Sequence, residues 1–98
     1  MNVTKNEDRS TIALEGDFTS DLLNDFRSAV QSEIDAGNIS LTIDFTDTAI
    51  IDSMGIGCLV ATHNTLKQKD GTMHLSNVPE NLMDVFKVMR LDRIFPIN

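Results

Sequence analysis

The stretch from residue 41 to residue 66 constrains the fold more than any other part of this chain, because its hydrophobic period changes along its length. Apolar and polar residues alternate over residues 41–45, and this two-residue period predicts a β-strand. From residue 56 onward, apolar side chains recur every three or four positions, which predicts a helix. A short turn must therefore join a strand to a helix, and it brings Asp52 and Ser53 to the beginning of that helix.

The sequence before this stretch predicts strands followed by one helix. Residues 2–14 predict one or two short strands. Residues 21–36 carry apolar side chains at helical spacing, with Thr19 or Ser20 in position to cap the helix N-terminus and Gly37 suited to end it.

The sequence after this stretch continues the alternation. Residues 72–76 predict a short strand, and Pro79 is expected at the first position of a third helix, where its missing N–H costs nothing. Residues 91–97 are expected to cover the core. Strands that alternate with helices in this way predict one α/β domain over residues 1–98, with a mainly parallel or mixed sheet and helices packed on it.

The composition makes several classes of function poor candidates. Fifteen acidic residues against eight basic ones give a net charge of −7, whereas a nucleic-acid-binding protein needs a basic face. The apolar residues between positions 49 and 61 are too few and too interrupted to span a membrane. The single cysteine, Cys58, cannot form an internal disulfide and fits a reducing compartment. The first ten residues have no signal-peptide core, so we expect a cytoplasmic protein.

Ser53 does not match a known catalytic serine motif. A nucleophile elbow requires glycine two positions earlier, where this chain has Ile51. His63 follows Ser53 by more than two helical turns and is too far along the axis to accept its proton. Gly55 and Gly57 lack the remaining residues of a dinucleotide-binding loop or a P-loop. None of these motifs therefore identifies Ser53 as a catalytic residue.

The sequence does not predict a metal or cofactor site. Cys58, His63 and His74 are the only soft metal ligands, and Cys58 and His63 point to different sides of the predicted helix. Asp44, Asp47 and Asp52 lie close together in the sequence, but turns collect aspartate for bonds to their own backbone. These carboxylates are therefore a weak candidate for a catalytic pair.

Two interpretations of Ser53 remain open from the residues alone. Serine is favoured as the N-cap of a helix, and it also lies where an added phosphate would meet the positive end of the helix dipole. Met54 and Ile56 make the first turn of the helix apolar. That turn is either buried or an exposed hydrophobic patch beside Ser53, and an exposed patch would be a binding surface.

The run Asp52-Ser53-Met54-Gly55-Ile56-Gly57 after the predicted strand resembles the signature of the STAS domain. It is most similar to single-domain bacterial anti-sigma-factor antagonists, in which Asp-Ser-Ser/Thr-Gly-Leu-Gly follows a strand and opens a helix. Residues 16–18 resemble the Gly-x-Leu/Phe turn of that family, and residues 77–95 follow its C-terminal pattern. The resemblance covers nearly the whole chain. It implies the STAS fold, with a mixed, mainly parallel central β-sheet of four to five strands and helices packed on it.

The resemblance also implies roles for individual residues. Ser53 matches the serine that is phosphorylated in the family, Asp52 the acidic residue before it, and Gly55 and Gly57 the glycines that begin the helix. Residues 52–57 are accordingly expected to bind the partner protein.

Two positions depart from the family pattern. Met54 replaces the second Ser/Thr, which leaves Ser53 as the acceptor at this site. Thr19 stands where many members have aspartate, so a role of that acid in partner binding or phosphorylation is not carried over to this chain.

The implied function is a partner-switching regulator without catalysis of its own. The unphosphorylated protein is expected to bind a GHKL-type serine kinase that doubles as an anti-sigma factor, and phosphorylation of Ser53 is expected to release it. A PP2C-type phosphatase would reverse the modification. No cofactor, metal, nucleic acid or membrane is expected to take part. The alternatives are a STAS interaction module with a non-transcriptional target or in a signalling assembly, and a small-molecule binder or enzyme with convergent polar groups in a pocket.

Overall fold

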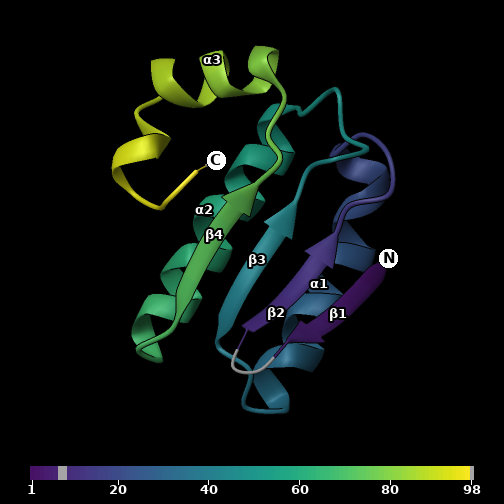
Figure 1. Cartoon of the computed structure of the whole chain (residues 1–98), viewed down its shortest axis with the longest axis vertical. Coiled ribbons are helices and arrows are strands. Elements are labelled where there is room, and N and C mark those ends of the chain that lie inside the picture. The colour runs from purple at the N-terminus through teal and green to yellow at the C-terminus, as the bar shows by residue number, and fades with distance from the viewer. Residues whose placement is uncertain (7–8, 98) are drawn as a thin grey trace.

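A computed structural model describes residues 1–6 and 9–97 of the chain, and four of its elements are strands of one sheet. The strands are β1 (Asn2–Asn6), β2 (Arg9–Ala13), β3 (Ser40–Asp44) and β4 (Thr72–Ser76), and they lie side by side in that order (Figure 1). β1 pairs antiparallel with β2, whereas β2–β3 and β3–β4 are parallel pairs. The predicted mixed, mainly parallel sheet is confirmed, with four strands.

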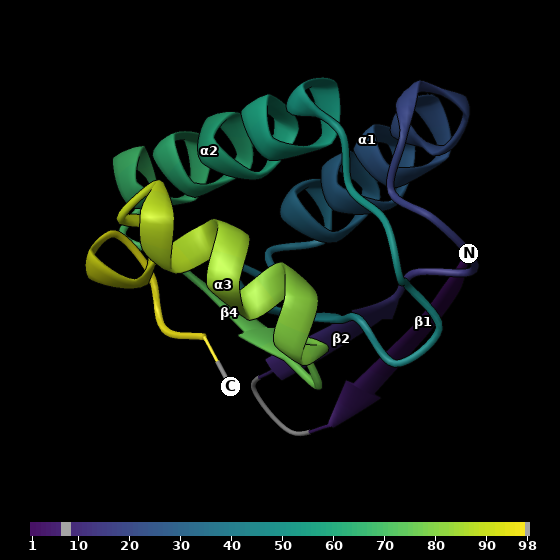
Figure 2. The ribbon, with the colours of Figure 1, turned by 90° about the horizontal axis from the view of Figure 1, so that it is seen from above.

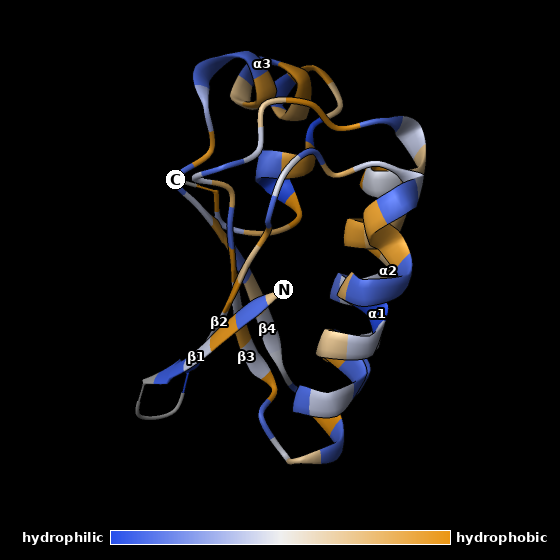
Figure 3. Ribbon diagram, turned by 90° about the vertical axis from the view of Figure 1, so that its right-hand side faces the viewer, coloured by the Kyte–Doolittle hydropathy of each residue, from blue (hydrophilic) through white to orange (hydrophobic). Residues whose placement is uncertain are grey.

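Two long helices cover one face of the sheet. α1 (Ser20–Asp35) and α2 (Ser53–Gln68) run along this face, and α3 (Glu80–Val88) lies across one end, followed by the short 3₁₀ helix η1 (Leu91–Arg93) (Figures 1 and 2). Figure 3 shows the sheet from its side, with α1 and α2 on the same face. In the part of the chain that the structure describes, no helix covers the opposite face.

The alternation of apolar and polar residues along the strands explains which face of the sheet the helices cover. Alternate side chains of a strand point to opposite faces, so one face of each strand can be apolar and the other polar. In β3, Leu41 and Ile43 are fully buried beneath the helices, and Met73 and Leu75 occupy the same positions in β4. Thr42 and His74, which are neighbours in the register, lie on the uncovered face. The helices therefore cover the apolar face of the sheet.

A row of phenylalanine rings connects this core to the end of the sheet where α3 lies. The ring of Phe18 packs against the ring of Phe26 in α1, with centroids 4.9 Å apart. The ring of Phe45, directly after β3, meets Phe18 at 6.5 Å and Phe86 of α3 at 5.9 Å, both edge to face. These are favourable aromatic geometries. The ring row thus ties α1, β3 and α3 together.

The ends of α1 agree with the sequence-based prediction, and the beginning of α3 does not. Thr19 is the N-cap of α1, and Gly37 ends that helix with a φ of 86°, in the left-handed region that glycine tolerates. Pro79 was expected at the first helical position of α3, but it is the N-cap, because its ψ of 155° is extended. Its carbonyl oxygen accepts the first backbone hydrogen bonds of α3, from Leu82 and Met83.

The C-terminal residues return to the sheet. Leu91 and Phe95 are buried, as expected for residues that cover the core, but Ile94 is exposed. The backbone N–H of Leu75 donates to the carbonyl oxygen of Pro96 at 2.9 Å, and Ile97 forms an isolated parallel bridge to Leu75. This segment therefore pairs with part of the outer edge of β4.

Replacing Phe45 by alanine is expected to lower the free energy of unfolding by about 3–5 kcal/mol, because the fully buried ring contacts two others. The measurement is urea denaturation followed by circular dichroism. Val88→Ala is the control, since Val88 is 82% exposed and its truncation should change stability by less than about 0.5 kcal/mol. Equal effects of the two substitutions would contradict the assignment of Phe45 to the core.

Candidate partner-binding site

The site predicted around Ser53 is built where two loops meet, the β2–α1 loop (residues 14–19) and the β3–α2 loop (residues 45–52). The carboxylate of Asp17 accepts hydrogen bonds from the backbone N–H groups of Ala49 and Ile50, at 3.3 and 3.2 Å. The backbone N–H of Phe18 donates to the carbonyl oxygen of Ile50 at 2.9 Å. The chain is thus held against the β2–α1 loop just before it enters α2.

Two further hydrogen bonds fix the β3–α2 loop. The buried hydroxyl of Thr48 donates to the carbonyl oxygen of Gly16 at 2.7 Å. The side-chain amide of Asn81, in α3, donates to the carbonyl oxygen of Ala49 at 2.9 Å. Segments that precede and follow the loop in the sequence therefore both hold it in place.

Asp44 stabilises the beginning of the same loop. One of its carboxylate oxygens accepts hydrogen bonds from the hydroxyl and backbone N–H of Thr46, at 2.6 and 3.0 Å, and from the amide of Asn77 at 3.0 Å. Burial raises the pKa of Asp44, but the three bonds favour the charged form more strongly and hold the pKa below its ordinary value of 3.8. Asp44 is therefore a charged turn residue that joins the ends of β3 and β4.

The N-cap of α2 is Asp52, and the interpretation of Ser53 as the cap is wrong. A carboxylate oxygen of Asp52 accepts a hydrogen bond from the backbone N–H of Gly55 at 2.8 Å, and the extended backbone of Asp52 is that of a cap residue. Aspartate caps a helix as well as serine does, and here Asp52, one position before Ser53, is the N-cap. Ser53 is the first residue of the helix itself.

The side chain of Ser53 is left exposed by this arrangement. Among residues 1–6 and 9–97, no hydrogen bond to another residue engages its hydroxyl. The hydroxyl lies in the first turn of α2, where the partial positive charge of the helix is concentrated. Ser53 is thus open to a modifying enzyme without the loss of a structural bond.

The apolar residues beside Ser53 are largely exposed. Met54 and Ile50 each expose 56% of their side-chain surface, whereas Ile56 is half-buried and packs against the core. Exposed apolar residues therefore lie at the end of the β3–α2 loop and in the first turn of α2, and we call Ile50, Ser53 and Met54 together the switch patch. Such patches are common at interaction sites.

The two glycines of the first turns of α2 have different surroundings. Gly55 is buried, and a Cβ atom there would collide with the carbonyl oxygen of Phe18 and come within 2.9 Å of Cγ1 of Ile51. Gly57 is exposed, and a Cβ atom there would meet nothing within 4 Å. Gly55 therefore lets α2 approach the β2–α1 loop, and Gly57 leaves the surface beside the switch patch open.

Asp17 is the residue of this site that sequence reasoning missed. It lies in the Gly16-Asp17-Phe18 turn, whose resemblance to the family pattern was noticed, but no role was assigned to its carboxylate. Thr19, where many STAS domains have an acid, is half-buried at the beginning of α1. The carboxylate of Asp17, two residues before Thr19, instead holds the β3–α2 loop.

The structure separates the residues that were weighed as metal ligands. Cys58 is buried in the core, whereas the ring of His63 packs on the ring of Phe95 with centroids 5.5 Å apart. Within the described ranges, no three His, Cys, Asp or Glu side chains are placed to hold one metal ion. None of the described helices is long and apolar enough to cross a membrane.

The chain has the fold of a STAS domain: a mixed four-stranded sheet with two helices on one face. One of these helices, α2, has a capped N-terminus and follows the central parallel strand β3. The family model described as "Mlab, STAS domain" matches residues 1–96, and the chain belongs to this family. This confirms the resemblance inferred from residues 52–57.

Solved structures show the same fold at low sequence identity. TM1081 of Thermotoga maritima, which has been proposed to be an anti-sigma factor antagonist, is 21% identical with a TM-score of 0.91, over 98% of this chain and 83% of that one. The unphosphorylated form of the Bacillus anti-sigma factor antagonist SpoIIAA is 18% identical with a TM-score of 0.72, over 95% of this chain and 96% of that one. A sulfate transporter family protein from Wolinella succinogenes is 12% identical with a TM-score of 0.80, over 92% and 73% of the two chains.

Asp52→Ala is expected to lower the free energy of unfolding by about 0.5–2 kcal/mol, because it removes the cap of α2. Ser53→Ala should change it by less than about 0.5 kcal/mol, since the serine hydroxyl does not cap the helix. Both are measured by urea denaturation. A larger loss for Ser53→Ala than for Asp52→Ala would return the capping role to the serine.

Gly55→Ala is expected to destabilise the protein by about 1–3 kcal/mol, because the new methyl group has no room against the backbone of Phe18. Gly57→Ala is the matched control on the same helix. It should stabilise the protein by up to about 1 kcal/mol, the difference in helix propensity between the two residues. Thermal and urea denaturation test the pair, and equal effects would contradict the close packing of α2 on the β2–α1 loop.

Proposed function

We propose that this protein is an anti-sigma-factor antagonist that works by partner switching and has no catalytic activity of its own. In its unphosphorylated form it binds a GHKL-type serine kinase that doubles as an anti-sigma factor, in the cytoplasm. The kinase phosphorylates Ser53, the complex dissociates, and a PP2C-type phosphatase restores the binding form. Membership of the STAS family and similarity in fold to SpoIIAA support this proposal.

The observation that carries the proposal is the setting of the Ser53 hydroxyl. It is exposed, lies outside the capping hydrogen bond and is flanked by the exposed side chains of Ile50 and Met54. A kinase can therefore bury the apolar residues of the switch patch while it reaches the hydroxyl. Gly57, also exposed, allows a partner to come close to the helix, whereas Gly55 contributes to the interface only by placing α2.

Electrostatics explains how one phosphate could act as a switch. Phosphorylation adds about −1.5 to −2 charges at neutral pH, directly beside the carboxylate of Asp52. Within the fold, the N-terminus of α2 favours this charge by about 0.3–1 kcal/mol. In a complex, the same phosphate would be pressed against apolar and desolvated groups, which is costly unless the partner supplies cations. The modification thus weakens binding without unfolding the domain.

The hydrogen bonds around the β3–α2 loop support a local mechanism. The bonds of Thr48 to Gly16, of Ala49 to Asp17 and of Asn81 to Ala49 hold this loop against the β2–α1 loop and α3, and none of them involves Ser53. Added charge at Ser53 therefore has no direct structural bond to break. We expect dissociation to follow from repulsion and bulk at the switch patch, with little change in the fold.

A second use of the same surface is an interaction module whose target is not transcriptional. The similarity of the fold to a sulfate transporter family protein supports this second possibility. In that case residues 52–57 would still form the contact surface, but a different protein would bind there.

The decisive measurement is the affinity of this protein for a candidate GHKL-type serine kinase from the same organism. Ser53→Ala should bind like the wild type, and Ser53→Asp should bind at least about tenfold more weakly, or about 1.4 kcal/mol. Asn64→Asp, which adds the same charge at an exposed position farther along α2, is the control and should bind normally. Equal binding by Ser53→Asp and the wild type, together with equal binding by authentic phosphoserine protein, would refute the switch.

A further inference from the structure

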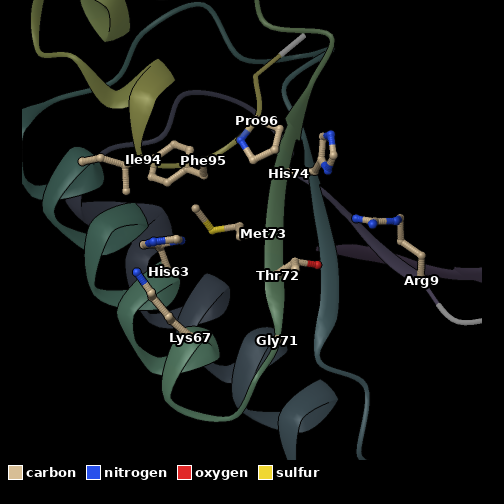
Figure 4. Close-up of a pocket in the computed structure, with 10 residues that line it drawn as sticks. All are labelled: Arg9, His63, Lys67, Gly71, Thr72, Met73, His74, Ile94, Phe95 and Pro96. Carbon is tan, nitrogen blue, oxygen red and sulfur yellow. The ribbon is translucent and has the colours of Figure 1, made fainter.

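A cavity of about 390 Å³ opens beside the outer edge of β4, toward the other end of α2 (Figure 4). Its apolar wall is formed by Met73 of β4 and by Ile94, Phe95 and Pro96 from the C-terminal segment. Met73 and Phe95 are almost fully buried, whereas Ile94 and Pro96 are exposed and form the accessible part of this wall. A volume of this size falls within the range of small-molecule sites.

The outer edge of β4 borders this cavity. In a parallel strand, successive residues direct their backbone groups alternately to the two sides. Thr72 N–H and Ser76 C=O bond toward β3, whereas the N–H of Leu75 bonds outward to Pro96. The backbone groups of Met73 point outward like those of Leu75, but Met73 lies two residues before Leu75, the residue that forms the bridge with Ile97. The N–H and C=O of Met73 therefore point to the outer side of β4, although Met73 as a whole is almost fully buried.

The polar side chains around the cavity are basic. Lys67 and His63 reach it from α2, and Arg9 and His74 lie on the other side of β4 (Figure 4). Among the described residues, those that line the cavity include no carboxylate, although the chain as a whole has fifteen acidic and eight basic residues. The guanidinium of Arg9 is oriented by a hydrogen bond to the hydroxyl of Thr42 at 3.2 Å. The charged side chains of the lining, Arg9 and Lys67, are thus both positive.

We propose that this cavity binds a small organic anion that carries an apolar chain or ring. The anionic group lies against the ammonium of Lys67 and the imidazole of His63. The apolar part packs on Ile94 and Pro96, the exposed apolar residues of the wall. These residues come from separate parts of the chain, so the sequence alone did not bring them together.

The cavity is independent of the proposed phosphorylation switch. His63 and Lys67 follow Ser53 by 10 and 14 residues in the same helix, which corresponds to about 15 and 21 Å along its axis. A ligand there does not reach the switch patch. The Ser53→Asp variant should therefore bind the ligand as the wild type does, so failure of one proposal leaves the other standing.

The test uses octanoate as the probe and two-dimensional ¹H–¹⁵N NMR of the full chain as the readout. Octanoate should shift the amide signals of Met73, Phe95 and their neighbours in a saturable way, and neutral 1-octanol should bind more weakly. Lys67→Glu should weaken octanoate binding by about tenfold, because it replaces the main cation of the site. Lys67→Met, which keeps the apolar stem of the side chain, separates loss of charge from loss of packing.

Lys69→Glu is the matched control, because it makes the same change in net charge at an exposed residue two positions away that does not line the cavity. It should leave octanoate binding within about twofold of the wild type, since exposed charges at a distance are screened. Equal weakening by Lys67→Glu and Lys69→Glu would mean that only overall charge matters and would overturn the proposal. Shifts confined to Ile50 and Met54, or to the exposed residues of α3, would overturn it as well.

Discussion

The arrangement of the site depends on the way the backbone at Phe18 is held against the entrance of α2. Its N–H donates to the carbonyl oxygen of Ile50, its carbonyl oxygen accepts from the N–H of Asp52 at 3.4 Å, and residues 18 and 51 form a parallel bridge. The ring of Phe18 is fully buried against two other phenylalanines. Because Gly55 has no side chain, the first turn of α2 can pack directly on this backbone. The position of Ser53 follows from these contacts.

This arrangement divides two tasks between neighbouring residues. Asp52 satisfies the free backbone N–H of Gly55 and orients the helix, and Ser53 is left with an exposed hydroxyl. A single serine that served as both cap and phosphoacceptor would lose a stabilising bond whenever it was modified. With the tasks separated, a phosphate at Ser53 would change the surface and leave the framework of the helix intact.

α2 also connects two surfaces of different character. Its first turn carries the switch patch, which is apolar and next to a carboxylate, while residues 63 and 67 border a cavity with basic side chains. The helix is 16 residues long, so these surfaces are separated by most of its length. We propose that one surface binds a protein partner and the other a small anion, and that they can be occupied independently.

The sequence by itself determined the order of strands and helices, the mixed, mainly parallel sheet and the location of Ser53 at the beginning of α2, because hydrophobic period and turn residues are local signals. It pointed to Ser53 as the cap of the helix, whereas Asp52 is the cap, since both residue types are good caps and the choice depends on where the backbone becomes helical. It also could not assign the role of Asp17, whose partners lie more than thirty residues away. Only the tertiary structure decided three further features, because each depends on segments that are distant in the chain. They are the exposure of Met54, the packing of Gly55, and the position of Arg9, His63 and Lys67 around one cavity.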